Sequence, residues 1–182
     1  HPEYVYVLLE VNGEKYVMAK ELYQQALKDC EIEEEVRIIQ EFKGSDLEGV
    51  ICVNPLVERD SLVILGQHVT LDAGTGCVHT APGHGIDDYE VGMRYDLPVI
   101  SPLDDNGVFT AEVPLLEGMP YYKANKKVTE VLHDNGSLMH LDFFNHQYPH
   151  CWRCKDPVIF RATEQWFASI KAFRQELLDE VD

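Results

Sequence analysis

The sequence predicts an α+β fold in which peripheral helices surround a barrel-like, mixed β-sheet. Two observations carry this prediction: β-prone runs dominate the chain up to Leu71, and helical segments follow at irregular intervals. This order lacks the strand–helix–strand rhythm of a parallel sheet and favours a mixed one. With 182 residues, 45% of them hydrophobic and 26% charged, the chain is long enough for one packed domain with a small appendage.

The first predicted element is a β-hairpin over residues 4–19. Two runs of β-branched and aromatic residues flank Asn12-Gly13, and this dipeptide is the strongest short-range hairpin signal. A helix over residues 20–30 follows, because its apolar residues recur at helical spacing. Further strands are expected at residues 35–42, 49–57 and 61–71.

Two helices are predicted in the second half of the chain, over residues 87–97 and 125–137. The second has a clear end, since Asn135-Gly136 is typical of a helix C-terminus. After about Leu141 the composition changes, and residues 145–170 predict an aromatic-rich turn, a Cys-x-x-Cys pair, a strand and a final helix.

The net charge of −17, from 32 acidic and 15 basic residues, argues against a broad nucleic-acid-binding face. It does not forbid contact with a single nucleotide, or with RNA that a partner domain holds. The one short basic cluster is expected to be the solvated face of a helix; it contains Lys123, Lys126 and Lys127. No apolar stretch is long enough to predict a membrane span.

Five cysteines at irregular spacing do not indicate a secreted disulfide framework, so a cytoplasmic location is expected. Cys30, Cys52 and Cys77 are expected to be buried as small apolar residues. Because the first residue is His1 rather than Met, the chain is expected to be a piece of a longer protein.

The most informative stretch is GTGCVHTAPGHGIDDYE, residues 74–90. Glycine and proline weaken the interior of a sheet, so this composition favours a loop that brings backbone close to a ligand. Two histidines, His79 and His84, and two carboxylates, Asp87 and Asp88, lie in or just after this loop. A purely structural loop is the alternative interpretation from the residues alone.

This stretch, with LVILGQHVTLDAGTG before it and YPHCWRCKDPVIFRATEQWF after it, resembles the editing insertion of bacterial-type isoleucyl-tRNA synthetases. The resemblance covers nearly the whole chain. Related valyl enzymes usually carry Lys where His79 stands, which favours the isoleucyl type over a valyl-type editing domain. The resemblance implies that residues 1–144 form the editing domain and that residues 145–182 form an exit segment leading back to a catalytic core.

The function that the resemblance implies is hydrolysis of the ester bond in valyl-tRNA(Ile), the mischarged product. A synthetic pocket sized for isoleucine rejects valine weakly, because one methylene group contributes only about 1–3 kcal/mol, the magnitude already established for this pair of amino acids. The implied partners are the 3′ end of the mischarged tRNA(Ile), its valine moiety and the remainder of the synthetase. No cofactor, bound metal or membrane is implied.

Carried over position by position, the resemblance gives Asp88 the role of holding the substrate's α-ammonium group. His79 lines the side-chain pocket and blocks the extra methylene of isoleucine. Four further residues are expected to bind substrate: Thr80, Gly83, His84 and Gly85. For His84 a hydrogen bond that braces the loop is an equal alternative. For Thr75 and Thr80 a local hydrogen bond to the backbone is a strong alternative. Asp87 is expected to be solvated.

The family also has a Thr-rich strand just before the position where this sequence begins. A non-catalytic module that binds aminoacyl-adenosine or the tRNA end, and needs those residues for hydrolysis, is therefore the alternative function. Cys151 and Cys154 have the spacing of a zinc knuckle. His146 and His150 lie close in sequence, but a half-site or two free thiols is the preferred interpretation. Phe160, Trp166 and Phe167 are expected to form an interface with the rest of the synthetase.

Overall fold

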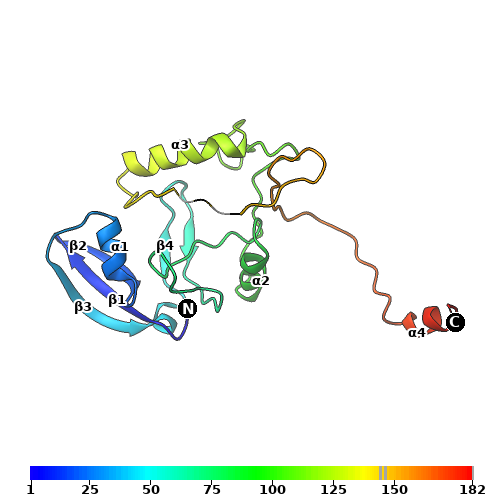
Figure 1. The fold of residues 1–182 in the computed structure, drawn as a ribbon, viewed down its shortest axis with the longest axis horizontal. Helices are drawn as coiled ribbons and strands as arrows, with labels where there is room; N and C mark the ends of the chain where they lie inside the picture. Colours follow the sequence, from blue (N-terminus) through cyan, green and yellow to red (C-terminus); the bar gives the residue numbers. More distant parts are fainter. Residues whose placement is uncertain (144, 146, 182) are drawn as a thin grey trace.

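The computed structural model describes residues 1–143, 145 and 147–181. Its N-terminal part is a three-stranded antiparallel sheet with the order β2-β1-β3 (Figure 1). The strands span Val5–Val11 (β1), Glu14–Ala19 (β2) and Val36–Lys43 (β3). Asn12 and Gly13 connect β1 to β2 with φ angles of 51° and 86°, the left-handed conformations that a tight hairpin turn requires. The predicted hairpin and the strand after it are confirmed.

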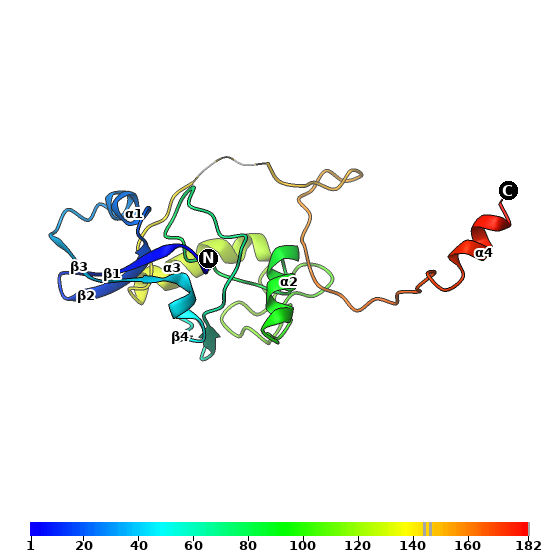
Figure 2. The same ribbon diagram turned by 90° about the horizontal axis from the view of Figure 1, so that it is seen from below.

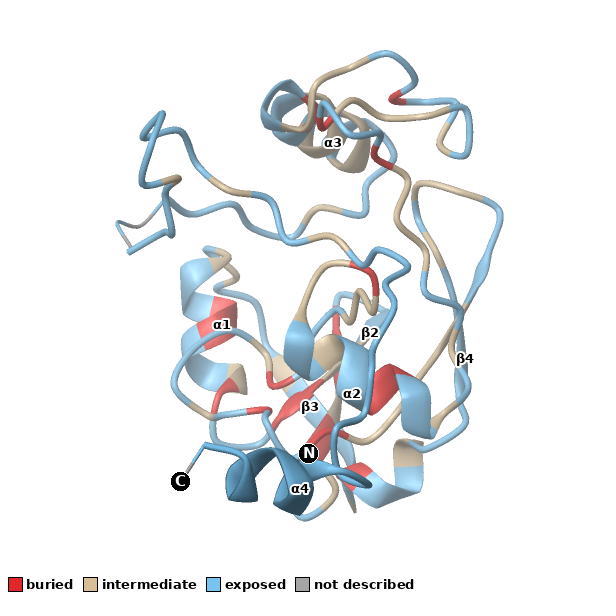
Figure 3. Ribbon diagram, turned by 90° about the vertical axis from the view of Figure 1, so that its right-hand side faces the viewer, coloured by how far each residue is buried: buried red, intermediate tan, exposed pale blue. Residues whose placement is uncertain are grey.

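Helix α1, Tyr23–Asp29, covers one face of this sheet and forms the main core with it. Alternate residues of β1 point toward the helix, as the two-residue period of a strand requires. The buried members of this core are Val7, Leu9, Val11, Met18, Ala26 and Leu27. Figure 3 shows how buried residues gather on the sheet and the adjoining side of α1. The helix predicted over residues 20–30 is confirmed, although it begins later and ends earlier than predicted.

The short 3₁₀ helix η1, Gly44–Leu47, leads from β3 to a second, two-stranded antiparallel sheet. Its strands are β4, Ile51–Val53, and β5, Asp60–Leu62. Both are much shorter than predicted, and the expectation of a strand through Leu71 is wrong. The chain turns at residues 67–68 instead, and Gly66 lies against this turn, since an added Cβ would lie 2.6 Å from the ring of His68. The mixed α+β class is confirmed, whereas the barrel-like sheet stays a prediction, because the two sheets of the described residues form no closed barrel.

Helices α2, Ile86–Arg94, and α3, Tyr121–Asp134, match the two helices predicted in this region. Asn135 ends α3, and Gly136 follows it with a φ of 74°, the conformation typical of a helix C-terminus. Lys126 is exposed and pairs with Glu130 at 3.7 Å, as expected for a solvated helix face. No helix in the described part of the chain combines the length and the apolar character that a bilayer span requires.

The C-terminal segment extends away from the body and ends in helix α4, Arg174–Asp179 (Figures 1 and 2). The strand expected within residues 145–170 is not formed; a single bridge, His150 to Pro157, is the β-pairing of its described part. The final helix begins later than expected. The boundary between residues 144 and 145 stays a prediction, and His146 lies outside the described residues.

Candidate functional site

The glycine-rich stretch is fixed at its start to the N-terminal sheet. The Tyr6 hydroxyl donates a hydrogen bond to the Gly76 carbonyl at 2.7 Å, and the Ala19 amide donates to the Thr75 carbonyl at 2.8 Å. Burial, with smaller effects from Cys77 and Tyr4, raises the pKa of Tyr6 to about 12. The phenol therefore stays protonated as a donor to the loop.

The loop at residues 81–85 is closed by Asp88, one turn into α2. The His84 amide donates to the Ala81 carbonyl at 2.9 Å, which turns the chain. The Asp88 side chain then reaches back, and its Oδ2 accepts the Ala81 amide at 3.2 Å. Gly85 leaves space for this carboxylate, since a Cβ there would lie 2.8 Å from the same oxygen. Asp88 is thus a residue of α2 whose side chain is hydrogen-bonded to the loop at residues 81–85.

The Asp88 carboxylate lies where it can accept further hydrogen bonds. It lies in the first turn of α2, where the helix dipole favours a negative charge. A carboxylate has two oxygens with about four acceptor positions, and among the described residues only Ala81 occupies one of them. The first turn of α2 also has no side-chain cap, so its N-terminal amides remain available as donors. Asp87 lies in this turn too, but its side chain is exposed.

His79 and Thr80 lie immediately before the loop that Asp88 closes. His79 is exposed and Thr80 is half-buried. Only Thr80 separates His79 from Ala81, so their Cα atoms are at most about 7 Å apart. Chain connectivity therefore keeps the backbone of His79 close to the Asp88 carboxylate. The roles assigned to His79 and Thr80 stay predictions.

His84 and Gly83 are held by a distant segment. His84 Nδ1 lies 2.9 Å from the Phe160 carbonyl oxygen, and the Ala162 amide donates to the Gly83 carbonyl at 2.8 Å. Gly83 is buried, and an added Cβ would lie 2.8 Å from the carbonyl carbon of Ile100. His84 thus makes the bracing bond that was one of its two interpretations. Sequence reasoning missed this brace, although the β-prone run around residue 160 was a signal of extended backbone.

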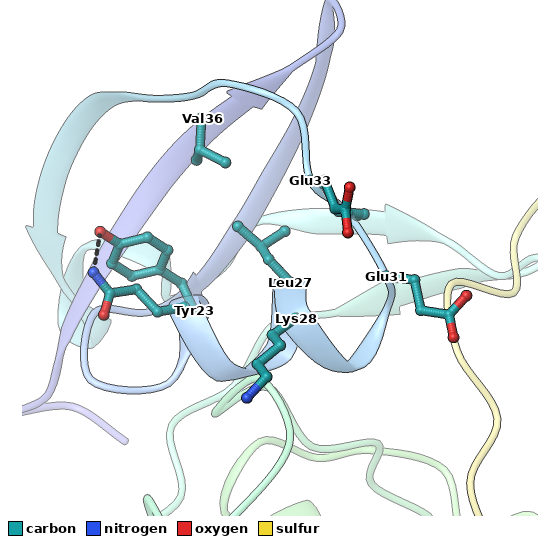
Figure 4. Close-up of a pocket in the computed structure, with 8 residues that line it drawn as sticks. Tyr23, Leu27, Lys28, Glu31, Glu33 and Val36 are labelled. Carbon is teal, nitrogen blue, oxygen red and sulfur yellow. Dashed lines mark hydrogen bonds between the residues drawn. The ribbon is translucent and has the colours of Figure 1, made fainter.

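Two surface hollows lie elsewhere in the described chain. One, of about 710 Å³, lies between α1 and the segment before β3. Figure 4 shows Tyr23, Leu27 and Val36 facing one another there, while Lys28 points away from the sheet. The other, of about 670 Å³, is lined by the turn at residues 103–107, the start of α3, residues 156–159 and Arg161. Neither includes His79 or Asp88 among its lining residues.

All five cysteines have free thiols. Cys52 and Cys77 are exposed and Cys30 is half-buried, so the expectation that these three are buried is wrong. Backbone N–H groups of Cys154 and Arg153 lower the pKa of Cys151. Within the described residues no cluster of three or more metal-ligating side chains occurs.

The aromatic side chains near the C-terminus are exposed, as a surface that contacts a partner would require. Phe160 is about half exposed, and Trp166 and Phe167 are almost fully exposed. Exposed apolar patches of this kind often mark interaction sites. Their partner stays a prediction.

Comparison with known proteins places this geometry in a family. The model of the family described as "Leucyl-tRNA synthetase, editing domain" matches residues 9–136. The isoleucine–tRNA ligase of Moorella thermoacetica is 58% identical over 181 residues, which is 100% of this chain and 19% of the relative. The isoleucine–tRNA ligases of Bacillus cereus and Bacillus mycoides are 56% and 55% identical, again over 100% of this chain and 20% of their own length.

The chain therefore spans about a fifth of the length of the curated relatives that it matches. The family match extends from the second half of β1 to the end of α3 and includes the whole glycine-rich stretch. The relatives named are isoleucine–tRNA ligases, which agrees with the isoleucyl assignment rather than the valyl one. On these matches the chain belongs to the tRNA-synthetase editing-domain family, within its isoleucyl-tRNA synthetase members.

Proposed function

We propose that this chain hydrolyses the ester bond of valyl-tRNA(Ile) and so acts as the aminoacyl-tRNA deacylase of a cytoplasmic isoleucyl-tRNA synthetase. Its partners are the 3′ end of the mischarged tRNA and the catalytic core of the same synthetase. The observation that carries the proposal is the Asp88 carboxylate: the Ala81 amide holds one of its oxygens at 3.2 Å, and no described residue hydrogen-bonds the other oxygen.

In the proposed reaction Asp88 binds the α-ammonium group of the valine moiety. A charge-assisted hydrogen bond of this kind fixes both position and orientation, so that a water molecule can attack the ester carbonyl. The attack places negative charge on the carbonyl oxygen. Uncapped amides at the start of α2 are suitable donors for that oxyanion. The acyl bond to the ribose oxygen then breaks: valine leaves with the hydroxyl of the water, and the ribose oxygen takes up the remaining proton of that water to become a hydroxyl group.

In the same proposal His79 restricts the side chain that can be accepted. Its exposed imidazole lies close along the chain to the Asp88-bound loop. A wall that admits valine and clashes with isoleucine provides the selectivity that binding of one methylene group cannot. Replacement of His79 by Ala is therefore expected to allow hydrolysis of correctly charged isoleucyl-tRNA(Ile).

The test is release of labelled valine from valyl-tRNA(Ile), measured for this chain and for the full synthetase that contains it. Asp88→Asn is expected to lower the rate at least a hundredfold, because the neutral amide cannot pair with the ammonium group. Asp87→Asn is the matched control, since it makes the same change one residue earlier on an exposed side chain. Equal losses in the two variants would contradict the assignment of Asp88, and no release above buffer by the full synthetase would contradict the proposed reaction.

A binding module without turnover is the second candidate, and the brace on His84 favours it. The ring's Nδ1 is already engaged with the Phe160 carbonyl, which leaves fewer free groups in the loop to activate water. Titration with a non-hydrolysable valyl-adenosine analogue distinguishes the candidates. Binding by this chain without hydrolysis, with hydrolysis restored when a Thr-rich strand of the kind that the family carries is added, supports the second candidate.

A further inference from the structure

The strap, defined here as residues 158–162, crosses the loop that Asp88 closes. It makes the two backbone contacts described above: the Phe160 carbonyl faces His84 Nδ1 at 2.9 Å, and the Ala162 amide donates to the Gly83 carbonyl at 2.8 Å. In extended backbone the carbonyl of one residue and the amide two residues later point to the same side. Both contacts therefore come from one edge of the strap, on either side of Arg161.

Arg161 anchors the strap to a different part of the body. Its Nη1 donates to the Leu103 carbonyl at 2.8 Å, and its Nη2 pairs with the Asp105 carboxylate. The Arg161 side chain is only 26% exposed, whereas that of Asp105 is 91% exposed. An ion pair with so exposed a carboxylate contributes little, so the bond to the buried Leu103 backbone is the more important anchor. A planar guanidinium that makes both bonds has one defined orientation.

The strap is also packed beside this anchor. Ile159 lies against the backbone of Gly107 and close to the ring of Tyr121, since a Cβ on Gly107 would be 2.7 Å from the Ile159 Cδ1 and 3.3 Å from the Tyr121 ring. The Gly107 amide and carbonyl are both engaged, with Asp104 and Tyr121 respectively. The turn at residues 103–107, to which Arg161 bonds, is therefore held by hydrogen bonds that do not involve Arg161.

From this arrangement we infer that Arg161 is a positioning residue for the proposed deacylation. It fixes the strap to the turn at residues 103–107, and the strap in turn fixes the position of the loop at residues 81–85. This inference rests on the proposed function for its consequence in catalysis, but its structural part is independent. Arg161 touches neither Asp88 nor His79, so it acts on the reaction only through the backbone of the loop.

The contact with His84 supplies a direct signature of the strap's position. A carbonyl oxygen can only accept a hydrogen bond, so His84 Nδ1 must carry the proton when it faces Phe160. The neutral ring therefore has Nε2 as its acceptor, although the Nε2–H tautomer is the usual one in free histidine side chains. When the strap is released, the Phe160 carbonyl no longer accepts a hydrogen bond from His84 Nδ1, and the Nδ1–H tautomer is no longer favoured.

The experiment compares Arg161→Ala with Arg153→Ala in the full chain. Arg153 is the matched control: it is exposed, lies close in the same segment and stacks on the Trp152 ring at 4.6 Å, away from the loop. Nitrogen-15 NMR of the histidine rings reports the His84 tautomer, assigned with a His84→Gln spectrum. Hydrogen exchange reports protection of the Ala162 amide, and single-turnover and steady-state deacylation of valyl-tRNA(Ile) separate kcat from KM.

Arg161→Ala is expected to shift His84 toward the Nε2–H tautomer and to speed exchange of the Ala162 amide at least tenfold. It is expected to lower kcat about tenfold with KM nearly unchanged, because a misplaced loop loses the geometry of attack rather than the binding groups. Arg161→Lys, which can still reach the Leu103 carbonyl with one donor, is expected to restore part of both structural signals. Asp105→Asn is expected to change them little.

If the His84 tautomer and the exchange rate of the Ala162 amide are the same in Arg161→Ala as in Arg153→Ala, the position of the strap does not depend on Arg161 and the inference is overturned. A change in both structural signals with normal kcat overturns the role in the reaction. If the unmodified synthetase releases no valine, the proposed function fails, and the NMR and exchange data still decide the structural part. Circular dichroism spectra of every variant establish that the measured protein is folded.

Discussion

Gly83→Ala tests whether the loop at residues 81–85 is held as tightly as the structure indicates. An added Cβ would lie 2.8 Å from the Ile100 carbonyl carbon and closer still to its oxygen, whereas ordinary contacts between carbon and oxygen begin near 3.3 Å. Both neighbours are backbone, so the loop must move away. Overpacking of this kind costs about 1–3 kcal/mol, and the bond from the Ala162 amide to the Gly83 carbonyl contributes about another 1 kcal/mol.

The smaller unfolded-state entropy of Ala offsets about 0.4–1 kcal/mol of that cost. The net expectation is a loss of about 2–3 kcal/mol in the free energy of unfolding, measured by urea denaturation, and a fall of about 5–10 °C in Tm. Gly118→Ala is the control: its φ of 74° makes Ala unfavourable, but no atom lies within 4 Å of the added Cβ, so only about 1 kcal/mol is expected. A loss at Gly83 no larger than that at Gly118 would refute the argument from packing.

Three further predictions concern the core, the pH dependence of stability and the hydrogen bond between Ala81 and Asp88. Leu9→Ala, at a fully buried position, is expected to lower the free energy of unfolding by about 2–5 kcal/mol, and a loss below 1 kcal/mol in urea denaturation would contradict the assigned core. Burial raises the pKa of Tyr6 from 10 to about 12, so the folded state favours the protonated phenol; the stability from this preference is present below pH 10 and is lost as the pH rises toward 12. Tyr6→Phe is expected to weaken that alkaline decline while costing about 1–3 kcal/mol at pH 7, and an unchanged decline in denaturation curves at pH 9 and 11.5 would show that another group causes it. Gly85→Ala is expected to displace the Asp88 carboxylate. It should lower valine release at least tenfold, with a change in unfolding free energy below about 2 kcal/mol. Normal deacylation would show that the hydrogen bond between the Ala81 amide and Asp88 is dispensable.

The parts of the fold that sequence predicts well are those with local causes. The Asn12-Gly13 turn fixes its own hairpin, and the Asn135-Gly136 pair ends its own helix, because each signal lies within the residues it governs. The strand expected after residue 60 had suitable β-prone residues, but a strand also needs a partner. β4 offers only three residues for pairing, so the remaining β-prone chain follows the body as irregular backbone.

The candidate site also has parts with local causes, which the sequence predicts, and parts with long-range causes, which it does not. The placement of Asp88 in the first turn of α2 was predictable, since the acidic pair follows Gly85 and Ile86, and a glycine can precede the start of a helix. The contact between His84 and Phe160 joins residues 76 positions apart. Such a contact depends on how the whole chain packs, and neither residue type signals it. The family resemblance predicts His84 as a site residue, while only the structure gives the group to which it bonds.

The extended tail that carries α4 has a practical consequence for handling the protein. From residue 163 onward, the hydrogen bonds of the described residues join the tail only to itself. An exposed segment of this kind is the preferred substrate of proteases, and Lys171 and Arg174 offer trypsin two cleavage points there. Brief digestion should therefore shed α4 and leave a shorter, trypsin-resistant species in which every bond of the glycine-rich loop survives.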